Sequence, residues 1–405
     1  MSAFKNTRMI GFSVVGLMSI LTWVGLVGCG SKGGGGSGGS SEVGSWKAIS
    51  TTGAAKTGAG GTAIWTGSKM ITFGGSLNSG NGAGDSYFNE VGIYDPNSDS
   101  WQKPDTAGIG LTPRAYHVAV WTGSKMILWG GITGARAPVD SGTFYDPSAN
   151  TASDMSVINA PSGRVGAHGF WTGTKLIIWG GGGAWGGTGE LLNTGGIYDA
   201  ATDSWATMST TNAPSARTGA SVVWTGTDMI VWGGRTGSES QTALNDGTKY
   251  NLATNTWTPI SATNAPTGDR FGHGAVWTGS KMVVIGGDGS ECVYPALTEQ
   301  AGASYDPTSD SWTAITTSVD CTGKSWFANW TGSKVIGIKE EAFEGGVTLD
   351  PQANSQEIIA GFSFSSIGGP SVLDVKPVWT GTQLIILGRN FLNNTTNAAG
   401  VALTL

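Results

Sequence analysis

Residues 117–131 read His-Val-Ala-Val-Trp-Thr-Gly-Ser-Lys-Met-Ile-Leu-Trp-Gly-Gly, and this stretch decides the fold of the 405-residue chain. A short apolar segment runs into a Trp-Thr-Gly tripeptide, whose glycine supplies the positive φ that a tight hairpin turn requires. A second apolar run follows and ends in two glycines. The stretch therefore predicts two short antiparallel strands joined by a turn.

This pattern recurs along the chain. Trp-Thr-Gly occurs seven times, at intervals of 49 to 56 residues, and it begins at Trp65, Trp121, Trp171, Trp224, Trp277, Trp330 and Trp379. After a variable loop, each unit continues with a third strand and then a fourth strand that usually carries a Trp. Four strands per unit, with no space for a helix, predict an all-β protein of seven propeller blades.

The details of the unit resemble the kelch repeat, in which a diglycine is followed by a Tyr and then by a Trp, with six residues between the Tyr and the Trp. The diglycines begin at Gly74, Gly130, Gly180, Gly233 and Gly286, and the matching pairs are Tyr94 and Trp101, Tyr198 and Trp205, Tyr250 and Trp257, and Tyr305 and Trp312. The resemblance covers residues 45–405 and implies a seven-bladed kelch-type β-propeller. It weakens at Ala152 in the second unit, at Lys339, Glu340, Leu349 and Gln356 in the sixth, and at the lone Gly388 in the seventh.

Ring closure is also predicted. Residues 45–52 read like the fourth strand at 204–211 but have no first three strands before them, and residues 400–405 read like a third strand with nothing after it. We expect the N-terminal strand at 45–52 to complete the last blade, which removes an open sheet edge.

The N-terminus has the features of an export signal. Lys5 and Arg8 precede an uncharged apolar stretch that ends at Gly28, and the sequence before Cys29 resembles the bacterial lipobox. This resemblance implies a signal peptide at 1–28, which is cleaved, and a lipidated Cys29. The alternative is an uncleaved membrane-spanning anchor, because about 20 apolar residues suffice to cross a bilayer.

Residues 29–44 predict a Gly/Ser tether with a reach of about 20 Å. The domain organisation is then 1–28, 29–44 and 45–405. Because Gly30 rather than Asp follows Cys29, we expect localisation at the outer membrane or cell surface. Loss of Lys5 and Arg8 lowers the net charge from −6 to about −8, which argues against a nucleic-acid partner. We expect a monomer.

After Cys29 only Cys292 and Cys321 remain. An even pair in an oxidising compartment predicts a disulfide between neighbouring blades. Closing a loop of about 30 residues would stabilise the fold by roughly a few kcal/mol in the chain-entropy account.

Basic residues recur just before the first strands. Arg114, Arg164, Arg217 and Arg270 each lie seven residues before their Trp, and Lys324 lies six before its own. They predict either a positive ring at the channel mouth that binds anions or framework residues that bond inter-blade carbonyls. Trp185, which lies in the loop Gly180–Asn193 and is not repeated in other units, is a candidate for stacking on a sugar or partner. Glu340, Glu341 and Glu344 form a carboxylate cluster that is either functional or simply solvated.

The histidines His117, His168 and His273 all fall in first-strand segments. Because the repeat separates them around the ring, we expect no metal site and no cofactor. The copper-ligand pattern of galactose oxidase, a related fold, is not matched.

Three functions remain open. The first is a binding module for a protein or glycan through the 2–3 and 4–1 loops. The second is a metal-independent carbohydrate-active enzyme, since exported kelch proteins such as sialic acid mutarotases are similar, although those have six blades. The third is a structural envelope component. The first is favoured because no acid/base or nucleophile constellation is visible and a fold alone does not imply chemistry.

Overall fold

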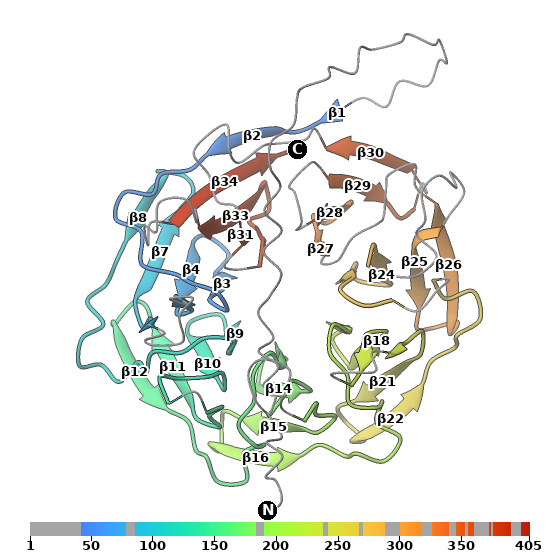
Figure 1. Ribbon diagram of the computed structural model, residues 1–405, viewed down its shortest axis with the longest axis horizontal. Coiled ribbons are helices and arrows are strands. Elements are labelled where there is room, and N and C mark those ends of the chain that lie inside the picture. The colour runs from blue at the N-terminus through green and yellow to red at the C-terminus, as the bar shows by residue number, and fades with distance from the viewer. Residues whose placement is uncertain are drawn as a thin grey trace, which may run out of the picture. The chain divides into compact units, whose positions relative to one another are not determined.

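Each of the seven Trp-Thr-Gly units forms its own antiparallel sheet in the computed structural model, and the sheets are arranged in a ring (Figure 1). The structure describes residues 42–77, 86–135, 137–183, 190–237, 242–266, 270–287, 300–316, 326–339, 346–352, 355–359, 372–373, 376–389 and 398–405. Residues Ser40–Leu405 form one compact unit. The predicted signal peptide, Cys29 and most of the predicted tether lie outside the described residues.

The blades are numbered by their Trp-Thr-Gly units. The first strands are β3 (Thr62–Trp65), β9 (Val118–Trp121), β13 (His168–Trp171), β17 (Ser221–Trp224), β23 (Gly274–Trp277), β27 (Trp326–Trp330) and β32 (Val378–Trp379). The second strands are β4 (Met70–Phe73), β10 (Met126–Trp129), β14 (Lys175–Trp179), β18 (Asp228–Trp232), β24 (Met282–Ile285), β28 (Val335–Lys339) and β33 (Gln383–Arg389).

The third strands are β7 (Val91–Asp95), β11 (Gly142–Asp146), β15 (Gly195–Asp199), β21 (Gly247–Asn251), β25 (Gln300–Asp306), β29 (Gly346–Asp350) and β34 (Ala398–Thr404). The fourth strands are β8 (Ser100–Gln102), β12 (Thr151–Asp154), β16 (Ser204–Thr207), β22 (Thr256–Pro259), β26 (Ser311–Thr316), β30 (Ser355–Ile359) and β2 (Ser45–Ala48). In Figure 1 the fourth strands run along the circumference and the first strands face the centre. The all-β, seven-bladed propeller that the sequence predicts is confirmed.

Among the described residues, seven hydrophobic clusters lie between the blades, one between each pair of neighbouring blades, and a small eighth cluster contains Ala115, Ile132 and Val165. A second strand is therefore covered on both sides, which is why residues such as Met126–Trp129 are apolar without alternation and fully buried. The cluster between blades 7 and 1 contains Ile49, Met70 and Ile385, so the ring is closed by the same packing that joins its other blades.

The predicted closure is confirmed, although it is shorter than expected. β2 pairs with β34, with Ser45 opposite Thr404 and Ala48 opposite Val401, so the strand ends before residue 52. One further strand was not predicted. β1 (Glu42–Val43), in the range assigned to the tether, pairs in parallel with β30 of blade 6. The N-terminal segment therefore joins two blades.

In four blades a recurring side-chain clasp binds the linker that enters the blade from the preceding one. In blade 3 the Tyr198 hydroxyl donates to Asp203 at 2.5 Å, and Asp203 also accepts from the backbone N–H of Ser156 in the preceding linker at 2.8 Å. The Trp205 indole N–H donates to the carbonyl of the same serine at 2.8 Å. The kelch Tyr and Trp are thus an inter-blade fastener as well as core residues. Blades 1, 4 and 5 repeat the clasp around Asp99, Asn255 and Asp310.

The departures from the repeat are accommodated locally. In blade 2, Ala152 cannot donate, and the side-chain amide of Asn150 instead donates to the carbonyl of Asp105 at 2.8 Å. In blade 6, Leu349 and Gln356 occupy paired positions that hold Tyr and Trp elsewhere.

Candidate functional site

Two sets of connections define two ends of the blades. The turn face carries the 1–2 and 3–4 turns, and the loop face carries the 2–3 loops and the 4–1 linkers. On the turn face the Trp-Thr-Gly turns share one geometry, since the threonine N–H donates to the carbonyl three residues later at 2.8 to 2.9 Å in all seven blades. The 2–3 loops of the loop face differ in length and sequence from blade to blade, and variable loops on a rigid scaffold are where binding residues usually lie.

The diglycine separates the blade from this variable region. Gly130 and Gly131 both have positive φ, 71° and 84°, and the chain then continues into a small second sheet. In blade 2, Ile132 bridges to Ala115 and to Pro138. Blades 1 and 4 form longer versions, in which β5 (Ser76–Leu77) pairs with β6 (Ser86–Tyr87) and β19 (Arg235–Thr236) pairs with β20 (Thr242–Ala243).

The recurring arginines are buried beneath these small sheets. Arg164 is 1% exposed, and its Nη1 donates to the carbonyls of Gly180 at 3.0 Å and Thr194 at 2.8 Å. Its own carbonyl accepts from the N–H of Gly131 in blade 2 at 2.9 Å. Arg164 therefore ties the 2–3 loop of its blade to its first strand and to the neighbouring blade.

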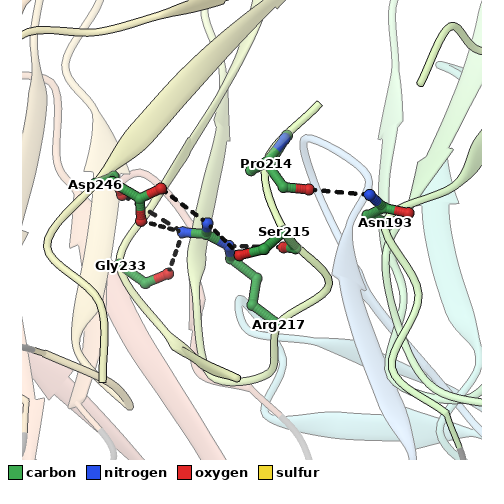
Figure 2. A network of polar contacts seen from close by, with 6 residues as sticks. All are labelled: Asn193, Pro214, Ser215, Arg217, Gly233 and Asp246. Carbon is green, nitrogen blue, oxygen red and sulfur yellow. Dashed lines mark hydrogen bonds and ion pairs between the residues drawn. The ribbon is translucent and has the colours of Figure 1, made fainter. Parts of the chain in front are cut away.

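The other three described arginines repeat this arrangement. Arg114, Arg217 and Arg270 are 1 to 3% exposed and donate to the carbonyls of Gly130, Gly233 and Gly286 at 3.0 to 3.1 Å. Figure 2 shows that the guanidinium of Arg217 is enclosed by Gly233, Ser215 and Asp246, which accepts at 2.9 and 3.1 Å. Burial lowers the pKa of Arg114 and of Arg164 to about 10, so both remain charged at neutral pH.

This placement favours the framework interpretation of the arginines over the anion-binding ring. The guanidinium groups, which would have to contact a ligand, donate to protein carbonyls instead. The framework interpretation placed these carbonyls in the neighbouring blade, whereas most of them lie in the same blade as the arginine. Lys324 and Trp185, the other candidate ligand-binding residues, lie outside the described residues. So do Cys292, Cys321 and the glutamates 340, 341 and 344.

A cavity of about 470 Å³ lies among the first strands, on the axis of the ring. Its lining comes from six blades and includes the backbones of residues 60–63, 116–119 and 166–170. Val222, Phe327 and Lys376 complete the wall. The volume is in the range of small-molecule sites.

Two of the three histidines reach this cavity from different repeat positions. His117 lies four residues before the Trp of its unit, whereas His168 lies three residues before its own. A hydrogen bond of 2.8 Å joins Nε2 of His117 to the hydroxyl of Thr62. Burial lowers the pKa of each of His117, His168 and His273 to about 3, so all three are neutral at physiological pH. In the described part of the chain, no three His, Cys, Asp or Glu side chains gather as a metal site would require.

The repeat position of His168 defines a set of seven residues, one from each blade, and five of them line the cavity. Its members are Thr62, Val118, His168, Ser221, Gly274, Phe327 and Lys376, each three residues before a Trp of a Trp-Thr-Gly unit. Lys376 is the one member with a full charge, and it is solvent-exposed.

The comparisons with known proteins agree with this geometry. A family model described as the KLHDC2/KLHL20/DRC7 Kelch-repeats domain matches residues 40–211 and 171–337. The chain belongs to the kelch-repeat family. No curated protein gave a match. As a kelch propeller, it has the scaffold of a protein-interaction module. Among the residues that the structure describes, this kelch chain has no helix that is long and apolar enough to cross a bilayer.

Sequence reasoning missed two residues on the cavity wall of this kelch propeller, Lys376 and Tyr116. The signal was present, because aligning the seven units on their Trp places Lys376 among uncharged residues and places Tyr116 at a position that is glycine in four of the other six units. The alignment does not show which way each side chain points. Only the packed ring shows that both positions face the axis.

Proposed function

We propose that this protein is an exported lipoprotein whose kelch propeller binds a protein or glycan of the bacterial envelope through its loop face. The observation that carries the proposal is the difference between the two faces. The turn face repeats one hairpin geometry, whereas the loop face holds small sheets that differ from blade to blade and surround the mouth of an axial cavity. A rigid ring with one variable face is the arrangement expected of a recognition scaffold.

The lipid anchor is supported by the residues before Cys29 and by the position of the first described strand. β1 begins at Glu42, which leaves a Gly/Ser-rich segment between Cys29 and the propeller. Such a segment holds a domain near a membrane without imposing an orientation.

The anchor is tested by expressing the wild type and Cys29→Ser with an alkyne-labelled fatty acid. We expect label on the wild type alone and loss of Cys29→Ser from the membrane pellet. If Cys29→Ser stays in the pellet without label, the apolar N-terminal stretch is an uncleaved span instead. A mass spectrum of the unreduced protein tests the proposed Cys292–Cys321 disulfide in the same preparation.

The binding surface is tested by arginine substitutions at uncharged, exposed positions of two blades. Ala135→Arg and Gly183→Arg place bulk in the 2–3 loops of blades 2 and 3. Ser124→Arg and Thr174→Arg place the same bulk in the 1–2 turns of the same blades and serve as controls.

The readout is a glycan array together with binding to isolated envelope fractions. We expect the wild type and the turn-face variants to bind equally and the loop-face variants to bind less. Equal loss from both faces would contradict recognition by the loop face. Absence of binding by the wild type would favour the structural envelope component.

A further inference from the structure

Two residues break the seven-fold repeat on the wall of the axial cavity, and each does so in a way that the fold itself does not require. Lys376 introduces a charge, and Tyr116 introduces a ring at a glycine position. The cavity is separate from the framework arginines, which are buried under the small sheets. The inference therefore does not depend on the partner proposed for the loop face.

Among the described residues that line the cavity, Lys376 is the one that carries a full charge at neutral pH. Of the described residues that line it, none is an Asp or Glu, and both lining histidines are neutral. The charge of Lys376 further lowers the pKa of His168, which also lines the cavity. A cation on the wall of a concave site, without an acidic neighbour among the described lining residues, favours ligands that carry a negative charge.

Tyr116 adopts a backbone conformation that its side chain disfavours. Its φ is 58°, and the equivalent residues are glycines in the other four blades where this position is described. Those glycines are Gly60, Gly166, Gly219 and Gly272, with φ between 64° and 72°. A left-handed conformation is rare for a bulky residue and is associated with functional sites.

The hydrogen bonds between the blades at this position do not require a tyrosine. The N–H of Tyr116 donates to the Gly60 carbonyl at 2.7 Å, and Gly272 makes the same bond to Gly219 at 3.0 Å without a side chain. The ring of Tyr116 lies against Gly60, where an added Cβ would be 2.6 Å from it. The side chain also packs on Ala115 and Ile132, which holds the ring in place.

The remaining wall suits a flat ring. Phe170 and Phe327 add two aromatic side chains to the lining. A cavity of about 470 Å³ admits a small molecule but not a folded partner. We propose that the axial cavity binds a small carboxylated ring compound, with Lys376 pairing with the carboxylate and Tyr116 contacting the ring.

The test is isothermal titration of the full-length protein in detergent micelles. The probes are benzoate and glucuronate as ring-bearing anions, benzamide and glucose as neutral counterparts, and acetate as an anion without a ring. We expect at least one ring-bearing anion to bind about tenfold more tightly than its neutral counterpart and than acetate. Benzoate alone would identify an aromatic acid, and glucuronate alone a sugar acid. Binding of neither at about 10 mM would overturn the proposal.

Two variants separate the contributions of charge and ring. Lys376→Met is expected to lower the affinity for the ring-bearing anion by about tenfold or more and to leave the affinity for its neutral counterpart unchanged. Tyr116→Gly restores the residue of the other blades, so the propeller is expected to fold, and the anion is expected to bind about fivefold or more weakly. Acetate binding should not respond to this variant.

Lys281→Met removes a lysine from the turn face and is the matched control for charge. The proposal is overturned if Lys376→Met binds the ring-bearing anion as the wild type does, or if Lys281→Met weakens it equally. A melting curve for each variant verifies folding. Ala135→Arg and Gly183→Arg change the loop face and leave the cavity residues unaltered. Failure of the axial site therefore shows in the titrations of the Lys376 and Tyr116 variants, whereas failure of the loop-face proposal shows in the glycan array and the binding to envelope fractions.

Discussion

Asn255 in blade 4 accepts a hydrogen bond from the backbone N–H of Ser209 in the linker from blade 3, with a distance of 2.8 Å between the atoms. The same oxygen accepts from the Tyr250 hydroxyl at 2.7 Å, and φ at Asn255 is 53°. One side chain therefore fixes the turn between two strands and fastens two blades.

The first prediction concerns this clasp. Asn255→Ala should lower the free energy of unfolding by about 2 kcal/mol, because two donors lose their acceptor and alanine disfavours a positive φ. Asn255→Asp should be close to the wild type, since aspartate occupies the position in blades 1, 3 and 5. Urea unfolding measures both. Equal loss in the two variants would show that the clasp does not depend on the accepting oxygen.

The second prediction concerns the buried arginines. Arg164→Lys should lower the free energy of unfolding by about 3 kcal/mol, because a single ammonium group cannot reach both carbonyls that the guanidinium bonds. Lys281→Arg, the reverse exchange on the turn face, should be neutral within about 0.5 kcal/mol. A stable Arg164→Lys would contradict the framework role and revive the anion-binding ring.

The third prediction concerns the diglycine. In Gly131→Ala the new Cβ would lie 2.6 Å from the Ala115 carbonyl oxygen, whereas in Gly123→Ala it would meet nothing within 4 Å. Both glycines have positive φ, so both variants carry the backbone cost of about 1 kcal/mol. Only Gly131→Ala adds a clash, and its melting temperature should fall further. Similar melting temperatures would mean that the small sheet yields without cost.

The fourth prediction concerns pH. The folded-state pKa of His273 is lowered from 6.5 to about 3 by burial, with a further contribution from the charge of Arg270. Between these values the unfolded chain binds more protons than the folded chain, so stability is lost as pH falls from about 6.5. Each such histidine adds a slope of at most about 1.4 kcal/mol per pH unit. His273→Ala should reduce the slope of the free energy of unfolding against pH.

The control for this experiment is Val284→Ala, which creates a cavity at a fully buried position without removing a titrating group. It should lower stability by a similar amount at every pH and keep the slope. Measurements above about pH 4.5 avoid the aspartates of the clasp, whose pKa values are lowered below 3.8 by hydrogen bonds from Tyr and backbone groups. An unchanged slope in His273→Ala would show that this histidine does not titrate on unfolding.

The fifth prediction concerns ring closure. Ile49 is 7% exposed and packs between blades 7 and 1, so Ile49→Ala should lower the free energy of unfolding by about 3 kcal/mol. Val157, which is 52% exposed in another linker, provides the control, and Val157→Ala should be near neutral. Hydrogen exchange should also become faster in β2 and β34 of Ile49→Ala. Unchanged exchange there would mean that Ile49 does not hold the closing strand.

The sequence by itself determined the number of blades, the order of strands within each blade and the closing role of the N-terminal strand. Those features depend on local chemistry that recurs at every unit, namely a turn that needs glycine, an apolar run of strand length and a Tyr followed by a Trp. The short strand β1 was not predictable, because Glu42–Val43 is too brief to stand out from the tether and depends on β30 for its pairing.

Only the tertiary structure decided what the basic residues face. Arg164 and Lys376 both precede a first strand, yet one is covered by carbonyls of a loop that lies 16 to 30 residues further along the chain and the other is open to the axis. Burial depends on neighbours that the repeat brings together in space, and the repeat does not encode which side of a strand remains uncovered. The meeting of Lys376 and Tyr116 in one cavity follows from closure of the ring, because closure alone places blade 7 near blade 2.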